Sequence, residues 1–183
     1  TLQFGDMRDG LVFARRTDEV SVYAVSQRAF DILPAASWEM YDRRIWQFSE
    51  EDVARVLIEQ RGLKRELIHS GTNAWSLATG SVGVINTFGV EEAVHRIGDL
   101  NAAFWTARGQ FDRAAYGFTN PVHRLTFELK NGTKREIEFG REAPSRFPYA
   151  TVTVNGEPWL FEFPWIIYQH IETYLSIPAP DDR

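Results

Sequence analysis

The chain has 183 residues and a formal net charge of −5, and it contains no cysteine. Its length fits one domain of ordinary size, and the lack of cysteine excludes disulfides, thiol nucleophiles and cysteine-ligated zinc. The basic residues occur in dispersed pairs beside acids, which disfavours nucleic acid as a partner. No apolar run approaches the length of a membrane span, so we expect no direct membrane insertion by this segment.

Residues 1–36 predict three strands followed by a helix, and the same order recurs near the C-terminus. The correspondence rests on three sets of positions: Phe4-Gly5 with Phe139-Gly140, Phe13-Ala14 with Tyr149-Ala150, and Tyr23 with Phe161. We therefore interpret residues 1–36 as the C-terminal half of a first repeat unit and residues 41–178 as a complete second unit. The two pieces are expected to pack as one globular domain. Because Thr1 already lies in strand-like sequence, we also expect an upstream part of the protein, which could include a membrane anchor.

The two corresponding helices begin at Ser26 and at Pro164, both common residues at a helix start. Apolar residues at helical spacing follow each of them: Ala29, Phe30 and Leu33 in the first helix, and Ile167, Ile171, Tyr174 and Leu175 in the second. The helices are expected to end near Pro34 and Pro178, and the polar tail 179–183 is expected to be frayed.

The segment after the first helix predicts a meander of strands. Residues 42–48 are expected to be extended, Ser49 to cap a turn, and strands to follow at 53–60, 63–69 and 74–77. Their buried face is predicted to hold four apolar residues: Val56, Ile58, Leu67 and Trp75. A helix over residues 49–60 is the open alternative, since apolar residues there also fit a helical period.

A loop over residues 80–89 is predicted to precede the clearest helix of the chain. Its apolar stripe, which would cover a sheet face, consists of Val90, Ala93, Val94, Ile97, Leu100 and Phe104. Residues 105–115 are expected to be irregular.

Residues 116–140 predict a β-hairpin with one apolar face. The alternation favours a three-residue loop with Gly132 in the left-handed conformation, and it pairs Phe127 with Arg135 and Leu125 with Ile137. In a second hairpin, Asn155-Gly156 is expected in an even-numbered loop that pairs Val154 with Trp159 and Val152 with Phe161. The predicted fold class is α+β: a mainly antiparallel β-sheet with about three covering helices and pseudo-repeated halves.

These elements resemble the bacterial family known as domain of unknown function 4340. The resemblance rests on Asp42-Arg43-Arg44-Ile45, Trp75-Ser76-Leu77, the helix from Val90, Tyr116-Gly117-Phe118, Phe139-Gly140, Tyr149-Ala150 and Phe161. It implies a repeated domain outside the cytoplasm, commonly anchored to the membrane, that often accompanies transport systems of the gliding-type ABC class. The family implies no catalytic residues.

Catalytic and metal-binding patterns are weak in this sequence. The four histidines lie far apart, and none has the spacing that would place two metal ligands on one helical face. His69 and Ser70 could form a base and a nucleophile, but neighbours on a strand point to opposite faces, so a hydrolase is the least favoured alternative. We expect no catalytic residue, no metal site and no cofactor.

One set of residues predicts a ligand-binding groove at the junction of the repeats. Its aromatic walls and cationic rims would come from Tyr41, Arg43, Arg44, Trp46, Tyr116, Phe118 and His123. Structural support of the junction is the competing interpretation.

We therefore expect a non-catalytic, extracytoplasmic interaction or scaffold module of a bacterial envelope assembly. A protein partner would bind by strand addition to an exposed sheet edge, and a homodimer formed through that edge is an open alternative. A small-ligand-binding module is the second functional hypothesis.

Overall fold

The computed structural model describes residues 1–31, 33, 36–119 and 123–178. The chain divides into two compact units, a first unit Thr1–Tyr41 and a second unit Asp42–Arg183. The boundary lies close to the one predicted between residues 36 and 41. The expected packing of both pieces into one globular domain stays a prediction, as does the interpretation as repeat units. The predicted helix end at Pro34 and the tail 179–183 lie outside the described residues.

The first unit is a three-stranded antiparallel sheet with short helices. In chain order its elements are β1 (Leu2–Arg8), β2 (Leu11–Arg16), β3 (Tyr23–Ser26), α1 (Gln27–Asp31) and the 3-10 helix η1 (Ser37–Met40). The strands lie in the order β1-β2-β3, and Asp9-Gly10 turns β1 into β2 with both φ angles positive. Ser26 caps α1, since its Oγ accepts the Ala29 amide at 3.2 Å. Gly5 lies inside β1.

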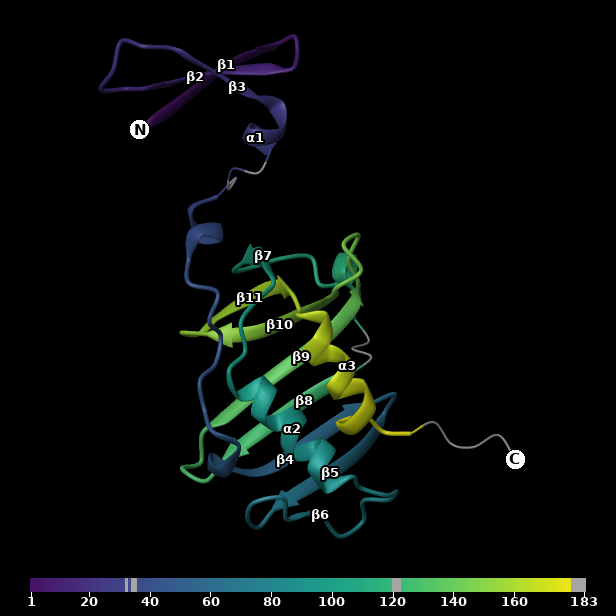
Figure 1. Ribbon diagram of the computed structural model, residues 1–183. Helices are drawn as coiled ribbons and strands as arrows, with labels where there is room; N and C mark the ends of the chain where they lie inside the picture. The colour runs from purple at the N-terminus through teal and green to yellow at the C-terminus, as the bar shows by residue number, and fades with distance from the viewer. Residues whose placement is uncertain (32, 34–35, 120–122, 179–183) are drawn as a thin grey trace. The chain divides into compact units, whose positions relative to one another are not determined.

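The second unit is built on an eight-stranded antiparallel sheet (Figure 1). Its strands are β4 (Val53–Gln60), β5 (Leu63–His69), β6 (Trp75–Leu77), β7 (Phe104–Arg108), β8 (His123–Leu129), β9 (Lys134–Glu142), β10 (Pro148–Val154) and β11 (Glu157–Glu162). Its helices are α2 (Thr87–Gly98) and α3 (Trp165–Tyr174), with the 3-10 turns η2 (Glu50–Asp52) and η3 (Ala114–Tyr116). The strand order is β6-β5-β4-β8-β9-β10-β11-β7.

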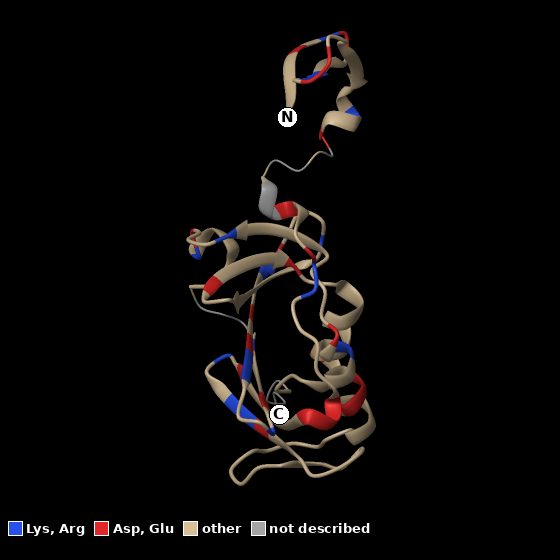
Figure 2. Cartoon of the chain, turned by 90° about the vertical axis from the view of Figure 1, so that its left-hand side faces the viewer, with Lys and Arg blue, Asp and Glu red and all other residues tan. Residues whose placement is uncertain are grey.

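Helices α2 and α3 cover one face of this sheet (Figure 1). That face carries the alternate apolar residues of each strand, including the fully buried Phe127, Phe139 and Phe161. The other face carries ion pairs between neighbouring strands, such as Arg55 with Glu66 at 2.8 Å. Acidic and basic residues are accordingly interspersed along the strands in Figure 2. The predicted α+β class with a mainly antiparallel sheet and three helices is therefore confirmed.

The structure decides between strand and helix for residues 49–60. Ser49 caps only the short turn η2, where its Oγ accepts the Glu51 amide, and Val53–Gln60 then forms strand β4. The predicted buried residues Val56, Ile58, Leu67 and Trp75 all lie in the core. The meander is therefore confirmed, because its strands pair β4 to β5 and β5 to β6.

The prediction for the central helix was wrong at both ends. Asn86 caps α2 by accepting the Gly89 amide at 2.9 Å, so the helix begins inside the predicted loop. It ends at Gly98, and Phe104, which was predicted to belong to the helix, instead begins strand β7. The rest of β7 lies in the region 105–115 that was predicted to be irregular. Leu100 is buried beyond the helix end. Apolar spacing alone could not separate the last turn of a helix from a buried turn and a strand that follow it.

The two hairpins tested the predicted registers. Leu125 pairs with Ile137, Phe127 pairs with Arg135, and Gly132 has a φ of +82°, all as predicted. In the other hairpin the loop is even-numbered, but it contains only Asn155 and Gly156, both with positive φ. Val154 therefore pairs with Glu157 and Val152 with Trp159. The predicted register was wrong by two residues, which leaves the same side chains on each face of the sheet. A two-residue turn of this kind matches the twist of the strands better than a longer loop does.

Candidate functional site

The sheet of the first unit leaves an apolar groove open on the side of α1. The groove has a volume of about 470 Å³, and the residues that line it include Leu2, Phe4, Ala14, Tyr23, Val25, Ala29 and Leu33. Phe4 is 42% exposed and Tyr23 is 51% exposed, although Phe4 packs edge-on against Phe30 of α1. An exposed apolar surface of this kind is a candidate interaction surface.

The opposite face of the same sheet has a second hollow of about 570 Å³ around Gly5 and Phe13. Phe13 is 38% exposed and Val22 is 61% exposed. A side chain at Gly5 would meet nothing closer than the Phe13 carbonyl at 3.8 Å. Glycine inside a strand weakens the strand and often marks a close approach of another backbone. Within the described part of the first unit, no backbone makes that approach.

Strands β1 and β3 form the two edges of the first sheet, because its order is β1-β2-β3. An edge strand leaves the backbone amides and carbonyls on its outer side available for pairing with another strand. The first unit therefore combines two open edges with an apolar surface on both faces.

Strands β9 to β11 of the second unit repeat the register of this sheet. Phe4 pairs with Ala14 and Ala14 with Tyr23, while Phe139 pairs with Ala150 and Ala150 with Phe161. A helix follows the third strand in each case. In the first unit the ring of Phe30, on this helix, lies 5.0 Å from the ring of Phe4. In the second unit the ring of Tyr168 lies 5.2 Å from the ring of Phe139. The positions that the sequence aligned thus have the same strand partners.

The corresponding positions differ in burial. Phe139 and Phe161 are both 0% exposed, whereas Phe4 and Tyr23 are not. Tyr149, which corresponds to Phe13, packs edge-on against Tyr116 at 4.9 Å. A side chain at Gly140, which corresponds to Gly5, would overlap the Tyr116 carbonyl oxygen. The surfaces of β9 to β11 that correspond to the open surfaces of the first unit are therefore covered by other residues of the second unit.

The residues predicted to form a ligand groove lie in different surroundings. The Arg43 guanidinium donates to the Ala103 carbonyl at 2.7 Å, and the exposed Arg44 side chain contacts Asp42 and Gln47. Trp46 is buried, and its ring packs against Phe127 on the helix side of the sheet. Tyr41 is an exposed residue at the end of the first unit.

Tyr116 and Phe118 lie together, on the opposite side of the sheet from Trp46. Phe118 forms a small apolar cluster with Ala143, Tyr149 and Leu160, and Tyr116 packs against it. His123 lies apart from them, 1% exposed beside Phe139 on the helix side. Burial lowers the pKa of His123 to about 4, so the ring is neutral near pH 7. A binding role for this set stays a prediction, and the structure brings only Tyr116 and Phe118 into one cluster.

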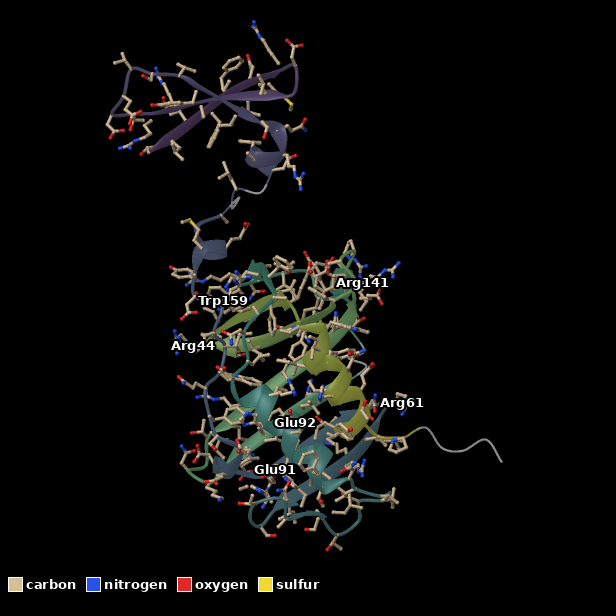
Figure 3. All side chains as sticks on the ribbon, in the orientation of Figure 1. Arg44, Arg61, Glu91, Glu92, Arg141 and Trp159 are labelled. Carbon is tan, nitrogen blue, oxygen red and sulfur yellow. The ribbon has the colours of Figure 1, made fainter. Side chains whose placement is uncertain are left out.

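His69 and Ser70, the pair considered as a base and a nucleophile, have separate contacts. His69 Nδ1 lies 2.9 Å from the Val53 carbonyl, its Nε2 lies 3.5 Å from Glu91, and the ring stacks on Trp75. The Ser70 hydroxyl instead donates to the Ala74 carbonyl at 3.1 Å. Glu91 and Glu92 project from α2 (Figure 3). No group of three or more potential metal-ligating side chains occurs among the described residues.

A polar cavity of about 340 Å³ lies where β9 and β10 stop pairing. Their ladder ends at Glu138 and Thr151, although both strands continue beyond it. Charged residues line much of the cavity, namely Arg113, Lys134, Arg135, Glu136 and Glu138, and Trp46 also contributes to its wall. Arg113 and Arg124 both pair with the largely buried Glu138 carboxylate. Sequence reasoning missed this cavity, because the end of pairing between two long strands has no local signal.

The sequence contained one overlooked signal for the surface on the first unit. Gly5 and Gly140 were matched with each other, and both lie inside strands, where a glycine often marks the close approach of another backbone. In the described part of the chain, no helix is both long and apolar enough to cross a membrane.

A family comparison places the chain in a known group. Residues 1–102 match the family model described as Domain of unknown function (DUF4340). The match covers more than half of the 183 residues, so the chain belongs to this family, as the resemblance of its residues predicted. The matched part contains the whole first unit and extends just past α2. Neither the curated proteins nor the solved structures contain a match to the chain.

Proposed function

We propose that this DUF4340 protein is a non-catalytic interaction module whose first unit binds another protein. The observation that carries the proposal is the open sheet of the first unit, with apolar side chains exposed on both faces and unpaired edges on both sides. A partner strand added to such an edge gains backbone hydrogen bonds, and alternate side chains of that strand enter the apolar surface.

The internal repeat is part of this proposal. Register and the ring contact of the following helix agree between β1 to β3 and β9 to β11. We infer that both arose from one structural unit, which supports the interpretation of residues 1–36 as the second half of a repeat. An extracytoplasmic position in a bacterial envelope assembly, where transport-associated scaffolding is needed, is the setting that we propose for this module.

Photo-crosslinking tests the interaction function. A photoreactive amino acid placed at Phe13 in the protein, expressed in its native host, should form an adduct with one recurrent polypeptide. The same group at Thr126, on the charged face of the second unit, is the control and should not form it. Adding Val22→Asp should abolish the Phe13 adduct, because a charge then enters the hollow that Phe13 and Val22 both line. Equal labelling from both positions, or an adduct that Val22→Asp leaves unchanged, would contradict the proposal.

Binding of a small anionic ligand is the second candidate function. The cavity between β9 and β10 favours it, because Arg113, Lys134 and Arg135 all line its wall. Calorimetry with phosphate, succinate and citrate tests this function. We expect Arg135→Glu to abolish binding and Lys130→Glu, on the neighbouring loop, to leave it unchanged. Absence of heat with all three anions would contradict an anion site.

A further inference from the structure

Strands β9 and β10 separate within the sheet of the second unit. Their ladder ends at the pair Glu138 and Thr151, yet β9 begins already at Lys134 and β10 continues to Val154. The polar cavity of about 340 Å³ lies in this gap and is lined from both strands. The gap is therefore a space between two neighbouring strands of one sheet.

Strand β9 presents unused backbone groups to the gap. Paired residues of an antiparallel ladder alternate between pairs that exchange two hydrogen bonds and pairs that exchange none. The Leu129 amide donates to the Thr133 carbonyl at 2.8 Å, so the odd-numbered residues of β9 bond to β8. Glu136 therefore directs its N–H and its C=O away from β8 and into the gap.

Strand β10 presents the second unused edge. The Phe163 amide donates to the Pro148 carbonyl at 2.8 Å, so the even-numbered residues of β10 bond to β11. Thr153 therefore directs its N–H and its C=O into the gap, opposite Glu136. Within the described residues, no backbone hydrogen bond crosses the gap at these positions. A single extended chain between the two strands would satisfy the donors and acceptors of both edges.

The gap has an apolar floor and one closed end. Trp46 and Val152, which are 5% and 3% exposed, line it on the helix side of the sheet. The pair of Glu138 and Thr151 closes one end, because the two strands join there. A chain that lies in the plane of the sheet cannot continue past this pair. The inserted strand must therefore end inside the gap.

Charge indicates which end of a chain fits. Arg113 lines the closed end, where it pairs with Glu138. Arg124 of β8 also pairs with Glu138 and lies 3.6 Å from Glu136, so a cation outside the lining offsets both acidic residues of the gap. Arg135, also in the lining, forms no ion pair with a carboxylate of the described chain. The excess of positive charge favours a terminal carboxylate over a terminal ammonium.

We propose that the gap between β9 and β10 binds the C-terminal end of another protein, which enters the sheet as an inserted strand. The proposal rests on the second candidate function and identifies the anion as the terminal carboxylate of a polypeptide. This carboxylate accepts hydrogen bonds from Arg113 at the closed end. The backbone of the preceding residues pairs with Glu136 on one side and Thr153 on the other, and an apolar side chain points to the floor at Trp46.

The test adds a pool of acetylated tetrapeptides of mixed sequence to the full chain, once with free C-terminal carboxylates and once with C-terminal amides. Hydrogen exchange of single backbone amides is the measurement. At saturating concentration the free-acid pool should slow exchange at Glu136 and Thr153 by about ten-fold or more. Exchange at Val152, whose amide already bonds to β11, should not change. The amide pool should have little effect at any of these positions.

Two variants separate the contacts to the carboxylate from those to the backbone. Arg113→Gln should reduce protection by the free-acid pool to the level of the amide pool. Arg141→Gln is the matched control, because Arg141 also contacts η3, through the Ala115 carbonyl, but does not line the gap. Thr153→Pro should abolish protection at Glu136 and keep the strands paired, since the N–H that it removes has no partner in the sheet.

Different results would overturn different parts of the proposal. Equal protection by both pools would reject the terminal carboxylate and the anion function together. Binding of phosphate, succinate or citrate without protection by either pool would retain the anion function and reject the inserted strand. Protection that rises with protein concentration in the absence of peptide would identify a second copy of this chain as the occupant. No response to the pools or to the small anions would reject both.

Discussion

The sheet β1 to β3 and the strands β9 to β11 have the same register and opposite burial. Phe4 and Phe139 have equivalent strand partners and equivalent ring contacts, yet only Phe139 is fully buried. The difference comes from β8 and β7, which pair with β9 and β11, and from Tyr116, which packs on Tyr149. The described residues of the first unit contain no counterpart of these contacts. Local sequence thus sets strand pairing, whereas neighbouring elements set how much each position contributes to stability.

Truncation of the two equivalent phenylalanines gives the largest expected difference. Phe139→Ala should lower the free energy of unfolding of the second unit by about 3–5 kcal/mol, because it removes a buried ring and leaves a cavity. Phe4→Ala should lower the stability of the first sheet by only about 1 kcal/mol, because the ring is already half in solvent. Urea titrations read by amide exchange in each sheet measure both values. Equal losses would show that the first sheet is as well covered as the second.

His123 distinguishes the buried sheet from the open one by its pH dependence. Its folded pKa of about 4 lies below the ordinary value of 6.5, so the unfolded chain takes up the proton first as the pH falls. Stability of the second unit should be complete above pH 6.5 and should fall by about 3 kcal/mol on reaching pH 4. His123→Phe should remove this loss, and His170→Phe, on the exposed side of α3, should retain it. An unchanged pH slope in His123→Phe would show that another group causes the loss.

The two matched glycines separate the sheets by close contact. Gly140→Ala should destabilise the second unit by about 1–3 kcal/mol, because the new methyl group overlaps the Tyr116 carbonyl oxygen. Gly5→Ala should leave the first sheet as stable as before or slightly more stable, since the same methyl group reaches only ordinary contact distance. Thermal unfolding of both variants provides the measurement. Destabilisation by Gly5→Ala in the isolated chain would reveal a covering contact on the first sheet.

The smallest expected effect on stability concerns the contact that joins α2 to η2 in the second unit. The described part of the first unit has no equivalent of α2. His95 and Glu50 join α2 to η2 at 2.9 Å; this hydrogen bond raises the pKa of His95 and lowers the pKa of Glu50. Stabilisation is complete between the ordinary pKa values of 4.5 and 6.5. It is lost as the pH rises through the folded pKa of His95 or falls through the folded pKa of Glu50. His95→Gln should cost less than about 1 kcal/mol at pH 5.5, since the pair is partly exposed, and salt should reduce this cost. A cost independent of salt would point to packing as its origin.

The sequence alone determined much of the strand plan. Alternation at Leu125, Phe127 and Ile137 specified the register of its hairpin, because a slip of one residue would turn these side chains toward solvent. Glycine and capping signals likewise identified Gly132 and Ser49. The matched positions Phe4 and Phe139 also have equivalent strand partners, which supports the inferred repeat.

Only the tertiary structure decided which of these positions are buried and where surfaces remain open. Strand β7 forms by pairing with β11, and Tyr116 of η3 packs against Gly140. Both contacts join residues far apart in the chain, so local residue spacing does not predict them. For the same reason, the sequence grouped Trp46, Tyr116 and His123 as one groove, although the sheet separates Trp46 and His123 from Tyr116. Side-chain identity states what a residue prefers to contact, and the topology determines which contacts it obtains.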